Sequence, residues 1–291
     1  MSGHDNDTPL AAAAAAAVHV RRNLKGTMKR PASPRVITVA NQKGGVGKTT
    51  SAVNLASAMA LAGLRVLVID LDPQGNASTA FGVDHHEDAV GSYDVLVEQR
   101  PIADVMVAAP GYESLWVLPA SLDLAGADIE LITSVSDEER PFRLREALDD
   151  FLADHEMDYV FVDCPPSLGM LTVNALAAVI EVLIPIQCEF YALEGVQQLL
   201  RTIEYARERL NPDLEVSMIL LTMYNTTTNL SLQVAASVRE FFGDTVLDSV
   251  IPRSTYVAEA PSFGQTVMTY DPGSTGAIAY LAAAREITAR G

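Results

Sequence analysis

The chain has 291 residues, 49% of them hydrophobic, and a formal net charge of −17. This length allows one or two domains, and the hydrophobic content is enough for a sizeable core. No apolar run is long and uncharged enough to span a bilayer. So acidic a chain argues against a broad DNA-binding face, because lysine and arginine supply the affinity for phosphates. The two cysteines lack metal-site spacing, so we expect them to be buried and the protein to be cytoplasmic.

Residues 1–34 are predicted to form a flexible, Ala-rich and basic N-terminal tail, and residues 35–291 are predicted to form one domain. The first 35 residues hold six basic and two acidic residues, so the remainder carries a net charge of −21. The alanine run over residues 11–17 favours a helix but offers no apolar face to a core. Two interpretations stay open: disorder, and a basic arm that binds nucleic acid, an acidic partner or a membrane surface.

A phosphate-binding loop is predicted at the start of the domain. The apolar residues 36–40 indicate a strand, and a helical pattern follows the glycine-rich residues 41–50. The spacing fits G-x-x-x-x-G-K-[ST], with Lys43 where the first glycine would stand. Glycines let backbone N–H groups converge on phosphate oxygens, and the helix N-terminus adds positive charge. We therefore expect Lys48 to reach the β- and γ-phosphates and the Thr49 hydroxyl to ligate Mg²⁺.

Two later apolar strands end in aspartate. Residues 65–70 are continuous and β-branched, as in a buried parallel strand, and they end in Asp70 with Asp72 two residues on. Ligands of open α/β sheets lie beyond the carboxyl ends of strands, where both carboxylates lie. Asp72 is the predicted catalytic carboxylate because Pro73-Gln74-Gly75 makes it part of a mobile loop, and Asp70 is the alternative. Residues 159–163 end in Asp163, which is expected to support Mg²⁺, partly through water.

The rest of the chain alternates predicted helices with predicted strands. Residues 84–114 are less regular, with two helical fragments at most. The alternation predicts an α/β fold, a mostly parallel twisted sheet with helices on both faces and right-handed connections. The further helices are expected over residues 51–62, 122–135, 143–155, 169–178, 193–210, 230–241 and 274–288, and the further strands over 116–119, 182–186, 216–222 and 245–251.

The glycine-rich loop resembles the deviant Walker A motif of the ParA/Soj/MinD ATPases, which are P-loop NTPases. The resemblance runs from about Arg35 to the C-terminus. MinD-like proteins usually end in an amphipathic membrane helix, whereas residues 277–290 here have few cations and read as a packed helix, so no membrane attachment is expected. The segments that indicate the ParA/Soj branch are Asn41-Gln42, Asp70-Leu71-Asp72-Pro73-Gln74-Gly75-Asn76, Asp163-Cys164-Pro165-Pro166-Ser167, residues 185–195, Val250-Ile251-Pro252-Arg253, Glu259-Ala260-Pro261 and Tyr270-Asp271-Pro272.

The resemblance implies a slow ATPase that needs Mg²⁺, is stimulated by a ParB-like partner, and forms a homodimer around two ATP molecules. Lys43 is expected to reach the partner subunit's phosphates, as an arginine finger does. Asp72 is expected to orient the attacking water, and Thr49, Asp72 and Asp163 to support Mg²⁺. The expected nucleotide contacts are Lys43, Gly44, Gly45, Val46, Gly47, Lys48, Thr49 and Thr50, with Met223, Pro252 and Arg253 near the base.

The chain departs from this family at positions that often carry a DNA-binding cation. It has Thr227, Tyr256 and Thr275 where arginine or lysine would be expected, and each lost phosphate contact removes salt-dependent affinity. Three functions therefore stay open. The first is an ATPase that segregates or positions a chromosome, plasmid or other cargo with a ParB-like partner, using the nucleoid as its track. The second is an orphan switch that acts through protein contacts, with weak or no DNA binding. The third is a metabolic P-loop enzyme.

Overall fold

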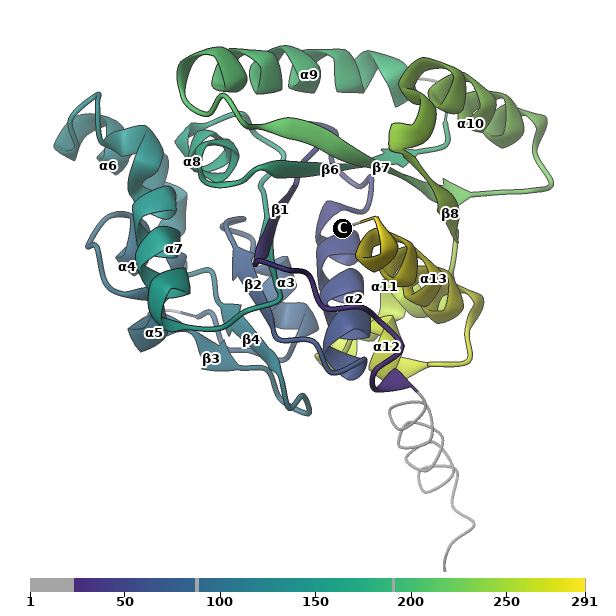
Figure 1. The fold of residues 1–291 in the computed structure, drawn as a ribbon, viewed down its shortest axis with the longest axis horizontal. Helices are drawn as coiled ribbons and strands as arrows, with labels where there is room; N and C mark the ends of the chain where they lie inside the picture. The colour runs from purple at the N-terminus through teal and green to yellow at the C-terminus, as the bar shows by residue number, and fades with distance from the viewer. Residues whose placement is uncertain (1–23, 87–88, 190–191, 291) are drawn as a thin grey trace, which may run out of the picture.

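The structure is a computed structural model that describes residues 24–86, 89–189 and 192–290. Its centre is an eight-stranded sheet in the order β3-β4-β2-β5-β1-β6-β7-β8 (Figure 1). Every neighbouring pair is parallel except β3 and β4, which are antiparallel. The mostly parallel α/β sheet predicted from the sequence is thus confirmed. The strands are β1 Arg35–Val39, β2 Val66–Asp70, β3 Val107–Ala108, β4 Leu115–Leu118, β5 Tyr159–Asp163, β6 Glu181–Gln187, β7 Glu215–Tyr224 and β8 Val246–Pro252.

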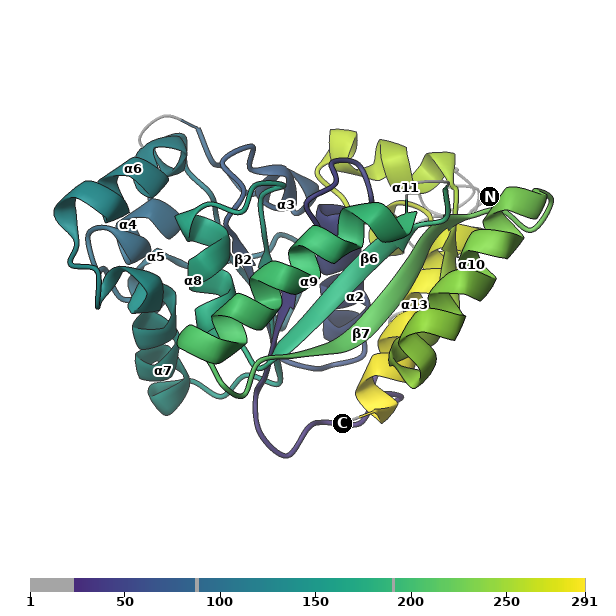
Figure 2. The same ribbon diagram turned by 90° about the horizontal axis from the view of Figure 1, so that it is seen from above.

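Helices cover both faces of the sheet. In Figure 1, α9 and α10 lie on one side of β6 and β7, and α2 and α13 lie on the other. In Figure 2, elements that follow strand carboxyl ends, among them α3, α6 and α11, gather along one edge of the molecule. The helices are α2 Lys48–Leu61, α3 Asn76–Ala80, α4 Ser92–Leu96, α5 Ile102–Val105, α6 Leu124–Ser134, α7 Arg143–Asp154, α8 Met170–Ala178, α9 Ala192–Arg209, α10 Asn229–Phe242, α11 Thr255–Glu259, α12 Val267–Tyr270 and α13 Thr275–Ala289.

The sheet separates two hydrophobic cores. Successive side chains of a strand point to opposite faces. Along β5, therefore, Val160 and Val162 join the core beneath α4 to α10, while Tyr159 and Phe161 join the core beneath α2, α12 and α13. All four side chains are fully buried. Burial on both faces is the reason that these strands read as continuous apolar runs rather than as alternating ones.

The predicted helices and strands are all present, within a few residues at their ends. Residues 84–114 contain the two short helices α4 and α5, as expected, and also the two-residue strand β3, which the sequence did not indicate. The short helices α3, α11 and α12 were also missed, because four or five residues are too few to show a helical period. The two cysteines are buried and unpaired, as predicted.

Both ends of the described chain pack against the domain. Leu24 and Met28 are 4% and 6% exposed, and the Gly26 N–H donates to the Ala62 carbonyl at 3.0 Å. Within the tail predicted over residues 1–34, Leu24 and Met28 thus join the core, whereas most residues between Lys25 and Pro34 are exposed; residues 1–23 lie outside the described part. Helix α13 buries Tyr280 and Ile287, as expected of a packed helix. None of the described helices combines the length and apolar character needed to cross a membrane.

Candidate nucleotide-binding site

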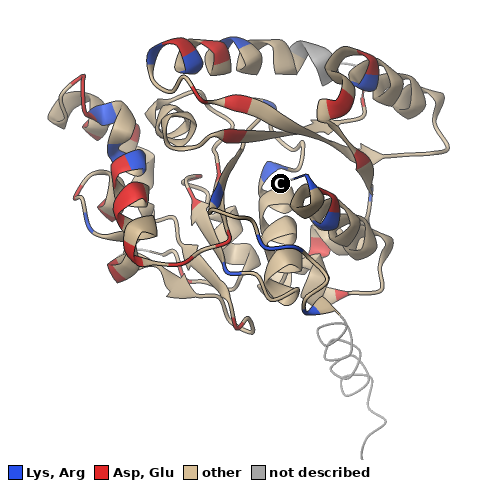
Figure 3. Cartoon of the chain, viewed as in Figure 1, with Lys and Arg blue, Asp and Glu red and all other residues tan. Residues whose placement is uncertain are grey.

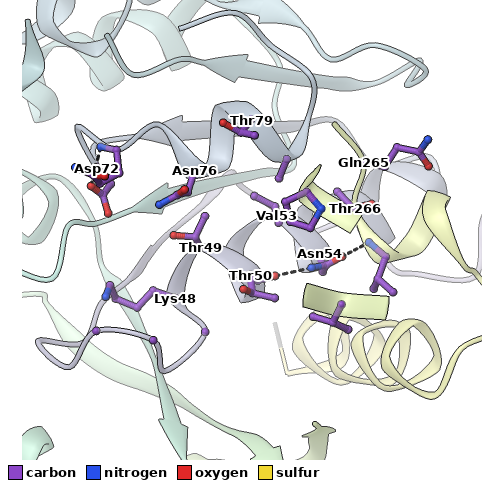
Figure 4. A pocket seen from close by; sticks show the side chains of 18 of the residues that line it. Lys48, Thr49, Thr50, Val53, Asn54, Asp72, Asn76, Thr79, Gln265 and Thr266 are labelled. Carbon is purple, nitrogen blue, oxygen red and sulfur yellow. Dashed lines mark hydrogen bonds between the residues drawn. The ribbon is translucent and has the colours of Figure 1, made fainter. Parts of the chain in front are cut away.

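A cavity of about 430 Å³ opens at the carboxyl ends of the strands. One wall of the cavity is formed by the glycine-rich loop after β1 and the first residues of α2. The remaining walls are formed by α3, Pro166, Met223 and residues of the α11–α12 region. Figure 4 shows Lys48 and Asp72 at one end of the cavity and Gln265 and Thr266 at the other. Of the predicted nucleotide contacts, the cavity is lined by Gly44, Gly45, Gly47, Lys48, Thr49, Thr50 and Met223.

The loop has the backbone that a phosphate cradle requires. Gly45 and Gly47 have φ angles of 75° and 92°, which residues with a Cβ rarely adopt. Gly47 precedes the first residue of α2, so the unpaired N–H groups of that helix N-terminus face the cavity. Thr222 on β7 fixes the loop from behind, because its hydroxyl donates to the Val46 carbonyl at 2.8 Å. The arrangement favours an anion of the size of a phosphate.

Lys48 lies inside this cradle. It is 7% exposed, and its ammonium donates to the Lys43 carbonyl at 3.5 Å, the outer limit of a hydrogen bond. Burial lowers the pKa of Lys48, an effect that the nearby carboxylates of Asp163 and Asp72 oppose. A buried ammonium group whose described acceptor is this weak is strongly stabilised by an anionic ligand.

Asp163 is a buried carboxylate without a hydrogen bond of ordinary geometry among the described residues. It ends β5, is fully buried, and neither oxygen accepts a hydrogen bond of ordinary geometry. Burial and the repulsion from Asp70 raise its pKa well above the usual value, and the nearby Thr49 hydroxyl and Lys48 offset this only partly. A metal ion held by one or two carboxylates, a hydroxyl and phosphate oxygens is the usual arrangement for Mg²⁺. The orphaned carboxylate beside Thr49 fits that ion.

The two aspartates after β2 have different surroundings. Asp70 is fully buried; one oxygen accepts from the Ser78 N–H at 2.8 Å and the Ser78 hydroxyl at 2.7 Å, and the other accepts from the Asp72 N–H at 3.2 Å. Burial raises the pKa of Asp70 to about 6. Asp72 instead lines the cavity, and its carboxylate accepts a hydrogen bond from the Gln74 N–H at 3.0 Å. This geometry favours Asp72 over Asp70 for a role toward a ligand.

The residues expected near the base are only partly at the cavity. Met223 lines it, with a φ angle of 49° that is uncommon for a residue other than glycine. The Arg253 guanidinium contacts the Met223 sulfur at 3.8 Å. Pro252 and Arg253 are not among the lining residues.

Lys43 and Val46 also lie off the cavity wall. Lys43 points instead toward the end of β6, where its ammonium pairs with the Glu189 carboxylate. Val46 is buried, and its carbonyl accepts the Thr222 hydroxyl.

Sequence reasoning missed more than half of the residues that line the cavity. Asn54 is the clearest case: it is 2% exposed, its amide donates to the Thr50 carbonyl at 2.7 Å, and its oxygen accepts from the Val267 N–H at 2.9 Å. A lone asparagine on the apolar face of a predicted helix was the available signal. The other missed lining residues are Val53, Gln74, Asn76, Thr79, Ala80, Pro166, Val257, Pro261, Gln265, Thr266 and Val267.

The positions where a DNA-binding cation was expected are on the surface. Thr227, Tyr256 and Thr275 are exposed, so no buried role explains the missing charge. In Figure 3, the positions of basic and acidic residues alternate along the ribbons of α7 and α9. Arg207 pairs with Glu204 at 3.1 Å and Arg239 approaches Asp248 at 3.8 Å, so part of the remaining cationic charge is locally compensated.

Comparison with known proteins gives consistent relatives. A protein-family profile described as "AAA domain" matches residues 34–216. The chain is 51% identical over 258 residues to the chromosome partitioning protein ParA of Caulobacter vibrioides, covering 88% of this chain and 94% of that protein. It is 46% identical over 257 residues to the sporulation initiation inhibitor protein Soj of Bacillus subtilis, covering 88% of this chain and 99% of that protein.

Solved structures agree on the fold. A cobyrinic acid a,c-diamide synthase of Mycobacterium smegmatis, with bound ADP and magnesium, has a TM-score of 0.73 and 38% sequence identity to this chain. The match covers 86% of this chain and 92% of that one. ADP and magnesium are the kind of ligand pair that the glycine-rich loop and the orphaned Asp163 would hold.

Proposed function

We propose, because this chain belongs to the ParA/Soj family of chromosome-partitioning ATPases, that it couples ATP hydrolysis to DNA segregation. It is an ATPase that uses ATP and Mg²⁺. The observation that supports the site assignment is the fully buried Asp163 carboxylate, which has no hydrogen bond of ordinary geometry within the described part of the chain and lies close to Thr49 and Lys48. Such a group is costly to keep unless a cation completes it.

In this proposal the chain's own residues divide the work of hydrolysis. The N–H groups of residues 44–49 and the Lys48 ammonium bind the phosphates and withdraw charge from the bond that breaks. Asp72, at the cavity wall, accepts a hydrogen bond from the attacking water and aligns it with the terminal phosphate. Thr49, Asp72 and Asp163 would hold Mg²⁺, partly through water, and the ion would supply positive charge that offsets the charge of the phosphates.

Two copies of the chain are proposed to close around two ATP molecules. Lys43 lies off its own cavity wall, which supports a role toward the second subunit's phosphates rather than its own. A cation supplied across an interface makes hydrolysis depend on association. ATP would then time the association of two subunits, and a ParB-like partner would shorten that time by stimulating hydrolysis.

We propose that the ATP-bound dimer binds DNA without sequence preference and is thereby located at the nucleoid, in the cytoplasm. The alternative is an orphan switch with weak or no DNA binding, and the exposed Thr227, Tyr256 and Thr275 favour it. The basic residues before the domain could restore the lost affinity. A metabolic function, as the name of the 38% identical synthase would suggest, predicts ATP turnover that needs a small-molecule substrate and no dimer.

An electrophoretic mobility shift with duplex DNA separates these functions. The full chain should shift DNA with ATP and Mg²⁺ at low salt, and the Lys48→Ala variant, which loses its phosphate contact, should not. Removing residues 1–23 tests the contribution of Arg21 and Arg22, leaves Lys25, Lys29 and Arg30 in place, and does not cut into the core, because Leu24 and Met28 are buried. If neither the full nor the shortened chain shifts DNA at low salt, the nucleoid-track function is contradicted and the orphan switch is supported.

A further inference from the structure

The backbone of Lys43 is tied to the carboxyl end of β6. Asn41 is 5% exposed, and its amide donates to the Pro185 carbonyl at 2.8 Å. The oxygen of the same side chain accepts from the Lys43 N–H at 3.0 Å. Because β1 and β6 are neighbours in the sheet, the Asn41 side chain fixes the position of the Lys43 backbone. The Lys43 side chain can therefore change direction while its backbone stays in place.

The Lys43 ammonium is paired within its own chain. Its partner is the carboxylate of Glu189, two residues beyond β6; the two side chains are 33% and 39% exposed. A Cβ at Gly195 would lie 3.9 Å from the Lys43 Cβ, so α9 borders the same side chain. The backbone before Glu189 is anchored, since the Cys188 N–H donates to the Thr222 carbonyl at 3.1 Å. Thr222 therefore fixes both the phosphate loop and the segment that carries Glu189.

We infer that Glu189 is a positioning residue that holds the Lys43 ammonium in its own subunit, and that Lys43 must exchange Glu189 for a phosphate of a second subunit when the ATP dimer closes. This rests on the proposed role of Lys43 across the dimer interface. The pair competes with dimer closure, because the same ammonium serves both partners. Both side chains are about one-third exposed, so the competition is mild and the exchange is reversible.

The size of the effect follows from the exposure. An ion pair of this kind shifts an equilibrium by about 1.5- to 5-fold. Closing a symmetric dimer breaks two such pairs, so removing the Glu189 charge should tighten the dimer by the square of that factor, about 2- to 25-fold. Glu189→Asp keeps the charge and should return the dimer affinity toward that of the wild type.

The test measures the dissociation constant of the dimer by sedimentation equilibrium, with Mg²⁺ and the non-hydrolysable analogue AMPPNP. Glu189→Gln should lower this constant, while leaving the melting temperature without nucleotide unchanged. The control is Glu204→Gln, which removes the same charge from an exposed ion pair with Arg207 on α9 and should leave the constant unchanged. An unchanged or higher dissociation constant for Glu189→Gln, or an equal decrease for Glu204→Gln, overturns the inference.

A Lys43→Ala variant separates this result from the proposed function. If Lys43→Ala dimerises as well as the wild type, Lys43 does not act across the interface, and the proposed function and the inference both fail. If Lys43→Ala does not dimerise and Glu189→Gln behaves as the wild type, the role across the interface stands and only the restraint by Glu189 is refuted.

Discussion

The carboxyl ends of β2 and β5 carry the same residue in register, yet the two sites differ. Asp70 and Asp163 are paired across the two strands, and both are fully buried. Asp70 accepts hydrogen bonds on both of its oxygens, from Ser78 and from the Asp72 N–H. Asp163 accepts none of ordinary geometry from the residues that the structure describes. The hydrogen bonds of the fold use one carboxylate, and we propose that the other binds a ligand.

This difference assigns the chemistry to particular residues. By accepting the Ser78 N–H and hydroxyl, Asp70 anchors the start of α3 and so holds the connection that carries Asp72 at the cavity wall. Asp163 lies on the other strand near Thr49 and Lys48, where neither of its oxygens has a hydrogen bond of ordinary geometry within the described residues. Substitutions at these positions should therefore separate activity from stability.

The largest expected effect is on hydrolysis, at Asp72. Asp72→Ala removes the carboxylate proposed to orient water and should lower the rate of ATP hydrolysis by about 10²- to 10⁴-fold. The phosphate contacts of the loop and Lys48 survive, so the variant should still bind ATP and remain a dimer. Phosphate release and light scattering measure the two properties. A variant that hydrolyses ATP at the normal rate would show that Asp72 was the wrong choice.

The next effect has opposite signs for activity and stability. Asp163→Asn should lower Mg²⁺-dependent hydrolysis by about 10²- to 10³-fold, and it should raise the melting temperature without nucleotide, because it removes a buried and repelled charge. The pKa of Asp163 is raised well above its usual value, so ionising this carboxyl group destabilises the folded protein. The cost is absent at low pH, where the group is protonated, and it grows as the pH rises. The gain in melting temperature over wild type should therefore grow from pH 4 to pH 8. A gain that shrinks with pH would contradict the assignment.

The smallest expected effect is on stability, at Asp70. Asp70→Asn leaves too few acceptors for the Ser78 and Asp72 donors and should lower the free energy of unfolding by about 1–3 kcal/mol. Urea unfolding measures this change, and Ser78→Ala should act in the same direction. If Asp70→Asn instead stabilised the protein as Asp163→Asn is expected to do, the contrast between the two strands would be lost.

Much of the fold and of the loop could be predicted because the signals are local. The strand before Gly44, the glycines and the Lys48-Thr49 pair are adjacent in sequence, and strand-end aspartates are visible as the last residue of an apolar run. The resemblance to a known family added the roles expected of Lys43 and Asp72. Each of these features can be read within a window of about ten residues.

What could not be predicted depends on partners that are distant or lie in short elements. Lys43 and Glu189 are 146 residues apart and meet only because β1 lies beside β6. Ser78 distinguishes Asp70 from Asp163, but it lies in the five-residue helix α3, which has no readable period. The burial of Leu24 and Met28 could not be predicted, because they lie in a basic, proline-containing segment. The sequence does not show which part of the domain such a segment packs against.

Thr222 on strand β7 links two segments of the chain that are far apart in sequence. Its hydroxyl and its carbonyl hold two separate segments, the phosphate loop at Val46 and the end of β6 at Cys188. Because both segments are hydrogen-bonded to Thr222, a displacement of one would shift the other. Thr222 itself is not among the residues that line the cavity. If the chain forms the proposed ATP dimer, sequence changes along β7 would alter the lifetime of that dimer without changing the residues that hydrolyse ATP.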